Sequence, residues 1–133
     1  MIDYFAQQYP FNQMTPEQLE FYEYLIHLRY WLIITSVCYY HFGEGIVSDV
    51  VWDEKAKELK YYQSVYGVLD IDPDIQNYFV EWQKERDLSL FDFRPNKFQT
   101  NTAQEYLNIR KTQTIYVPQM NDYKYMRNKK CRN

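Results

Sequence analysis

The apolar and polar positions along the chain predict a long first helix. Thr15 can cap its N-terminus, and Pro16 suits the first helical position, where a backbone N–H is not needed. Apolar side chains then recur at helical spacing from Leu19 onward, and the segment YWLIITSVCYY is apolar on nearly every side. We therefore predict a helix from about Pro16 to about His41, with its second half at the centre of the core.

A second helix is predicted directly after a glycine-containing turn. The segment FGEG places two glycines within three residues, which favours a turn over a continued helix. Ser48 then provides an N-cap, and residues 49 to about 66 show helical spacing with Ala56 and Leu59 on one face. Because the connection is so short, we expect the two helices to be antiparallel neighbours.

A third helix begins in the segment DIDPDIQ. Asp72 can cap this helix, and Pro73 again suits the first helical position. We predict that it continues to about Arg86. Its apolar residues recur at helical spacing, so Phe79 and Trp82 are expected to face inward.

The remainder of the chain carries weaker structural signals. The segment DLSLFDFRPNKFQTN suits a loop or a short edge strand, because apolar residues alternate there beside a proline. Thr102 and Glu105 have the spacing of a capping box, which predicts a short helix ending near Lys111. The segment TQTIYV is compatible with a brief strand.

These elements predict a mainly α fold: a small helical domain built on an antiparallel helical hairpin, with a short irregular or β-containing C-terminal extension. A chain of 133 residues is long enough for one core and too short for two. We expect an N-terminal arm over residues 1–14, the helical domain over 15–111 and a basic C-terminal extension over 112–133.

The charges are distributed unevenly along the chain. Residues 1–93 hold 16 acidic and 6 basic residues, a balance of −10, whereas residues 94–133 hold 2 acidic and 9 basic residues, a balance of +7. The basic residues nearest the C-terminus are Lys124, Arg127, Lys129, Lys130 and Arg132. They have two interpretations: a segment that is solvated or packs on the protein's own acidic body, or an arm that binds nucleic-acid phosphates.

Composition also bears on location and on the class of activity. The two cysteines are too few for a disulfide framework, and the first residues lack the basic start and apolar run of a secretion signal. The longest apolar run has 11 residues, against the roughly 20 that cross a bilayer. We therefore expect a cytoplasmic protein without a membrane span. We find no metal-ligand cluster, glycine-rich phosphate loop or serine elbow, so we predict that the chain is not an enzyme.

One stretch, YYHFGEGIVSDVVWDEKAKEL, gathers aromatic rings and carboxylates. Asp49, Trp52 and Asp53 share one face of the predicted second helix. The turn before them should fold this face against Tyr39 and Tyr40. Such a cleft suits a flat cationic ring, because aromatic faces attract cations and carboxylates accept hydrogen bonds from hydroxyl groups. A helix cap at the start of the second helix would explain some of the same residues by local chemistry alone.

The order of these residues resembles a known family. Tyr39 and Tyr40 are followed by eight residues, then by Asp49, two residues, Trp52 and Asp53, with a serine before the first aspartate. This pattern is similar to the signature Tyr-Tyr-x8-Asp-x-x-Tyr-Asp of the small N-terminal helical domain of NAD-dependent bacterial DNA ligases. The resemblance covers about residues 20–66. The family's catalytic Lys-x-Asp-Gly motif does not occur in this chain.

The resemblance implies a ligand and roles for the residues. In that family the domain holds the nicotinamide mononucleotide half of NAD. By resemblance, Tyr39 and Tyr40 would stack on the ligand, Asp49 and Asp53 would make polar contacts, and Trp52 would replace the second tyrosine while keeping a stacking face. No cofactor is required, and NAD or nicotinamide mononucleotide is the candidate ligand.

Function is predicted as binding rather than catalysis. We interpret the chain as a non-catalytic protein-interaction module on a ligase-like hairpin, of the phage or mobile-element type, which inhibits a host nucleic-acid-processing complex. Its acidic body and its 15 tyrosines suit such a role, and its aromatic content leaves a homodimer open. The two alternatives are a binder of nicotinamide mononucleotide or NAD, and a nucleic-acid binder that uses the basic C-terminal end.

Overall fold

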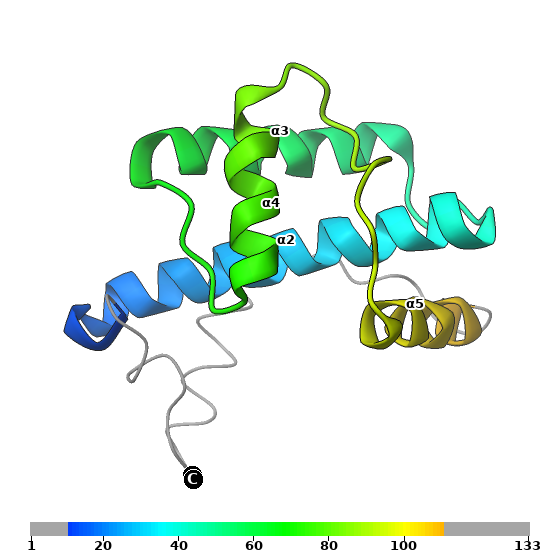
Figure 1. Ribbon diagram of the computed structural model, residues 1–133, viewed down its shortest axis with the longest axis horizontal. Coiled ribbons are helices and arrows are strands. Elements are labelled where there is room, and N and C mark those ends of the chain that lie inside the picture. Colours follow the sequence, from blue (N-terminus) through cyan, green and yellow to red (C-terminus); the bar gives the residue numbers. More distant parts are fainter. Residues whose placement is uncertain (1–10, 111–133) are drawn as a thin grey trace, which may run out of the picture.

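The computed structural model describes residues 11–110, which form a mainly α domain of four α-helices after one short turn of 3₁₀-helix (Figure 1). The elements are η1 (Phe11–Gln13), α2 (Pro16–Phe42), α3 (Asp49–Tyr66), α4 (Pro73–Lys84) and α5 (Lys97–Arg110). Most of the expected N-terminal arm and all of the extension over 112–133, with its brief strand, lie outside the described residues.

Helix α2 is the central element of the domain. In Figure 1 it runs between α3 and α5, which both pack on it, while α4 crosses in front and contacts α3. Helix α3 returns alongside α2 in the opposite direction. The two helices therefore form the antiparallel hairpin that the short glycine-containing connection predicts.

Local chemistry sets both ends of α2. The Thr15 hydroxyl accepts a hydrogen bond from the Gln18 backbone N–H at 3.2 Å, and the Gln18 side chain accepts one from the Thr15 N–H at 2.9 Å. This reciprocal pair satisfies two N–H groups at the helix start. At the other end, Gly43 adopts a φ of +71°, a left-handed conformation that favours glycine. The predicted start of this helix is confirmed, and it ends one residue beyond the predicted His41.

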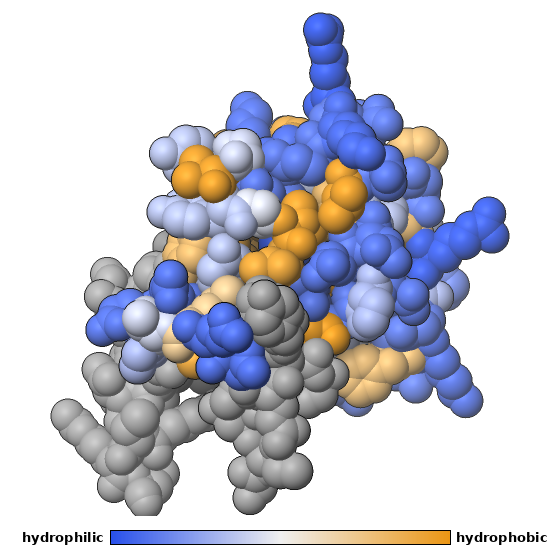
Figure 2. Space-filling model, turned by 60° about the vertical axis from the view of Figure 1, so that its left-hand side comes forward, coloured by the Kyte–Doolittle hydropathy of each residue, from blue (hydrophilic) through white to orange (hydrophobic). Residues whose placement is uncertain are grey.

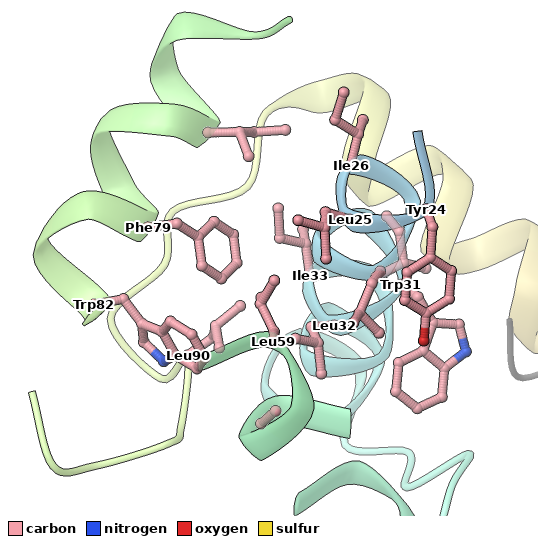
Figure 3. Packing of buried hydrophobic residues seen from close by; sticks show 14 of the residues in the cluster. Tyr24, Leu25, Ile26, Trp31, Leu32, Ile33, Leu59, Phe79, Trp82 and Leu90 are labelled. Carbon is pink, nitrogen blue, oxygen red and sulfur yellow. The ribbon is translucent and has the colours of Figure 1, made fainter. Parts of the chain in front are cut away.

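The core forms around the second half of α2, as predicted. Every residue from Trp31 to Cys38 is buried. In Figure 3, Leu32 and Ile33 of α2 lie opposite Leu59 of α3 and Phe79 of α4. The rings of Phe79 and Trp82 also pack edge to face, with their centroids 5.2 Å apart. The predicted inward faces of the second and third helices are therefore confirmed.

The surface is more polar than the core. On the face seen in Figure 2, hydrophilic residues predominate, and the apolar side chains show through in separate patches. Among residues 11–110, no helix combines the length and apolar content that a membrane span requires.

The start of α5 differs from the prediction. The expected capping box of Thr102 and Glu105 does not begin the helix, which instead starts at Lys97. Asn96 and Gln99 form the reciprocal pair instead: the Gln99 N–H donates to Asn96 Oδ1 at 2.8 Å, and the Asn96 N–H donates to Gln99 Oε1 at 2.9 Å. Thr102 lies within the helix, where its hydroxyl donates to the Phe98 carbonyl at 2.9 Å.

Two smaller differences concern the connection between α4 and α5. Helix α4 ends at Lys84, two residues before the predicted Arg86, because Glu85 turns to an extended ψ of 152°. The alternative of an edge strand after α4 is wrong for the described residues, since residues 85–96 form no strand and follow an irregular path with turns and bends until α5 begins.

A buried ionic network joins three of the helices and the connection between α3 and α4. The guanidinium of Arg29, which is fully buried, donates from Nε to Gln63 Oε1 at 2.7 Å. Its Nη1 donates to the Leu69 carbonyl at 2.6 Å and forms an ion pair with Asp70 Oδ2 at 3.0 Å. The Gln63 amide in turn donates to Gln83 of α4 at 2.7 Å. Arg29 thereby fixes α3 and the start of α4 against α2.

Candidate functional site

A cleft of about 460 Å³ lies where the end of α2, the turn after it, the start of α3 and the connection between α4 and α5 meet. All five residues predicted for a binding site line it: Tyr39, Tyr40, Asp49, Trp52 and Asp53. Its volume falls within the range of about 300–1,000 Å³ that is usual for small-molecule sites. The fold therefore brings the predicted aromatic and acidic residues to one concave surface.

The two tyrosines form an exposed aromatic corner of the cleft. Their side chains are 56% and 51% exposed for Tyr39 and Tyr40, respectively. The ring centroids are 4.9 Å apart and the planes are inclined by 85°, so one ring presents its edge to the face of the other. Both rings come from the last turns of α2, just before Gly43 ends the helix. They offer aromatic surface for a flat ligand to stack on.

Trp52 forms a more rigid wall. Its indole Nε1 donates a hydrogen bond to the Thr35 hydroxyl of α2 at 2.9 Å. That hydroxyl lies 2.8 Å from the Trp31 carbonyl and 3.1 Å from the Leu32 carbonyl, to which it can donate. The bond ties the indole to the neighbouring helix and fixes the orientation of its plane. The sequence showed the ring but not this partner, because the partner belongs to a different helix.

The carboxylates of Asp49 and Asp53 lie one helical turn apart on α3 and are both exposed. Capping of this helix is performed by Ser48, whose hydroxyl accepts a hydrogen bond from the Val51 N–H at 3.2 Å. Neither aspartate side chain forms a hydrogen bond or ion pair with another residue between 11 and 110. Local capping therefore accounts for the serine and leaves both carboxylates available to a ligand.

The connection between α4 and α5 adds residues that the sequence did not indicate. Arg86, Asp87 and Ser89 all line the cleft. The Ser89 N–H donates to Asp87 Oδ1 and its hydroxyl donates to Oδ2, each at 2.9 Å. These bonds lower the pKa of Asp87 below its ordinary value, so this carboxylate is ionised at neutral pH. The pattern Asp-x-Ser is a local turn signal, but it does not reveal that the turn faces α2 and α3.

The charges of the cleft favour a cation. Within the described part of the chain, its charged lining consists of the carboxylates of Asp49, Asp53 and Asp87 and the guanidinium of Arg86. Clefts lined mainly by one sign of charge concentrate ligands of the opposite sign. Residues 11–110 contain no cluster of three or more His, Cys, Asp or Glu side chains suited to a metal ion. The arrangement therefore provides stacking surface, negative charge and hydrogen-bond acceptors.

Lys124, Arg127, Lys129, Lys130 and Arg132 lie outside the described residues, so a nucleic-acid interface at the C-terminal end stays a prediction.

Comparison with protein-family models, with curated proteins and with solved structures gave no match. The similarity to the ligase domain accordingly rests on the signature residues alone.

Proposed function

We propose that the cleft binds a nicotinamide nucleotide, either nicotinamide mononucleotide or the corresponding half of NAD, without transforming it. The observation that carries this proposal is the convergence of Tyr39, Tyr40, Asp49, Trp52 and Asp53 on one cleft of ligand size. These are the positions that the ligase-domain signature assigns to the ligand, and they come from two helices that one short turn joins.

The physical basis is a match of shape and charge. An oxidised nicotinamide ring is flat and positively charged, so it is attracted to the faces of Tyr39, Tyr40 and Trp52. Ribose hydroxyls are donors, and the exposed carboxylates of Asp49 and Asp53 are acceptors. The 133 residues contain no Lys-x-Asp-Gly motif, and the proposal is therefore limited to binding.

Isothermal titration calorimetry of the full chain with nicotinamide mononucleotide tests the proposal. We expect saturable binding, weakened at least about tenfold by Asp53→Asn, because a charge-assisted hydrogen bond to the ligand is lost. Glu54→Gln is the matched control, since this neighbouring acid is exposed and does not line the cleft. Circular dichroism of each variant checks that the helices are intact.

The proposal fails if millimolar nicotinamide mononucleotide produces no binding heat in the wild-type chain. It also fails if Asp53→Asn and Glu54→Gln bind with the same affinity. A matched effect of both substitutions would mean that the acids act only through the overall negative charge of α3.

A second candidate function is the protein-interaction module predicted from the sequence, a phage or mobile-element inhibitor of a nucleic-acid-processing complex. The observation that favours it is the exposure of large apolar side chains next to and on α5: Phe91 is 65% exposed and Phe98 is 70% exposed. Exposed aromatic residues are common at the centres of protein interfaces.

A pull-down from bacterial lysate at low salt tests this second candidate. We expect a stoichiometric partner that is retained by the wild-type chain and lost from Phe98→Ser. Val50→Ser is the control, because Val50 is similarly exposed, at 67%, but lies on α3. Recovery of no stoichiometric partner would count against the interaction module.

A further inference from the structure

The one basic side chain in the described lining of the cleft, Arg86, is placed to contact a ligand. Its guanidinium is exposed and makes no hydrogen bond or ion pair with any other residue between 11 and 110. Of the two carboxylates adjacent to it in sequence, Glu85 and Asp87, only Asp87 lines the cleft, and it is engaged by two hydrogen bonds from Ser89. Within the described part of the chain, Arg86 therefore keeps all of its donors available, although the rest of the charged lining is acidic.

The backbone that carries Arg86 is held on both sides. On one side, Lys60 of α3 donates from Nζ to the carbonyls of Trp82, at 2.8 Å, and Glu85. On the other side, the Trp82 indole N–H donates to the Leu88 carbonyl at 3.0 Å, and Leu90 is only 1% exposed in the core. The position of Arg86 at the cleft is thus fixed by the fold, and only its side chain has to be ordered when a ligand binds.

We infer that Arg86 binds a phosphate group of the ligand and makes the cleft selective for a phosphorylated nicotinamide nucleotide over the nucleoside. A guanidinium presents two parallel N–H donors that match phosphate oxygens. In the otherwise acidic cleft, a phosphate without this partner would be repelled by Asp49 and Asp53. This inference rests on the proposed function, and it assigns the cleft a role for each half of the ligand: acids and rings for the cationic base, Arg86 for the anion.

Two ligands that differ only in the phosphate test the assignment. Calorimetry should show that the wild-type chain binds nicotinamide mononucleotide at least about tenfold more tightly than nicotinamide riboside. Arg86→Gln should remove or invert this preference while changing the affinity for nicotinamide riboside by less than about twofold, since the riboside has no phosphate for the side chain to bind. Arg94→Gln is the control: Arg94 is also exposed on the same connection, but it does not line the cleft.

The possible outcomes separate the two proposals. If the wild-type chain binds both ligands with equal affinity, the role of Arg86 is overturned and binding of the nicotinamide base in the cleft stands. If Arg86→Gln weakens the binding of both ligands equally, the specific phosphate contact is overturned. It is also overturned if Arg94→Gln loses the preference for nicotinamide mononucleotide to the same degree as Arg86→Gln. If neither ligand binds, the proposed function fails and the role of Arg86 fails with it.

Discussion

Replacing Arg29 by Met should remove a large part of the stability of the domain. The substitution keeps an unbranched side chain of similar length but deletes the fully buried guanidinium. Three acceptor atoms then lose the hydrogen bond from Arg29: Gln63 Oε1 at 2.7 Å, the Leu69 carbonyl at 2.6 Å and Asp70 Oδ2 at 3.0 Å. Gln63 and Asp70 are buried, at 3% and 9% exposed, so little water can replace the hydrogen bonds that they lose.

The size of this loss of stability follows from the burial of both charges. The side chains of Arg29 and Asp70 are 0% and 1% exposed, so the remaining carboxylate has little access to solvent. Removing one partner of such a pair costs about 3–5 kcal/mol. We therefore expect a loss of about 4 kcal/mol in the free energy of unfolding, out of the roughly 5–15 kcal/mol typical of a domain. In a domain of this size, the melting temperature would fall by roughly 15–30 °C.

The loss should also depend on pH. Burial raises the pKa of Asp70, while the hydrogen bond from the Asp72 N–H and the Arg29 guanidinium oppose that rise. In Arg29→Met the contribution of the guanidinium is lost while burial and the Asp72 hydrogen bond stay, so the folded-state pKa moves further above the unfolded value of about 3.9. A group with a raised folded-state pKa stabilises the fold below its unfolded pKa, and that contribution is lost as the pH rises through the folded-state pKa. The difference between wild type and variant should therefore be larger at pH 7.5 than at pH 5.

Urea denaturation followed by far-ultraviolet circular dichroism measures these effects. Lys84→Met is the control, because its ion pair with Glu81 is 65% and 72% exposed and should contribute no more than about 1 kcal/mol. Adding Asp70→Asn to Arg29→Met should restore part of the stability at pH 7.5, since it removes the unpaired charge. The reasoning is refuted if Arg29→Met loses no more stability than Lys84→Met, or if its deficit is independent of pH.

Two further predictions concern the ends of the helices, and both are checked by the same denaturation experiment. Gly43→Ala should cost about 1 kcal/mol or more, because a side chain is strained at a φ of +71°. Gly45→Ala should have little effect, since its added Cβ would make only an ordinary contact. Equal losses of stability in the two variants would contradict this explanation. Asn96→Ala should cost about 1 kcal/mol through loss of the cap. Thr102→Ala should not destabilise α5, because Ala suits a helix interior. The reverse order of stabilities would show that the helix begins at Thr102.

The limits of the helices followed from the sequence where the signal was local. Thr15 and Gln18 cap α2 with atoms that lie within one turn of chain, and Gly43 ends that helix through its own backbone conformation. The bounds of α3 were likewise predicted from Ser48 and from helical spacing. Such signals are readable because the interacting groups are neighbours in sequence.

The start of α5 was not decided by local signals, because two capping boxes competed. Starting the helix after Asn96 places Gln99 and Ala103 on the buried face, where they are 4% and 0% exposed. The Ala103 carbonyl then lies within 3.5 Å of Cys38 Sγ on α2. With the cap at Asn96, α5 therefore packs against α2. The position of α2 cannot be read from residues 96–105.

By itself the sequence determined the mainly α class, the helical hairpin and the five aromatic and acidic residues of the candidate site. It could do so because those five residues flank one short turn, so that the hairpin alone brings them together. Only the tertiary structure decided that Arg86 and Asp87 join them and that Thr35 orients Trp52. The physical reason is distance along the chain: the connection after α4 reaches the cleft because Lys60, Trp82 and the buried Leu90 hold it there, through contacts that exist only in the folded protein.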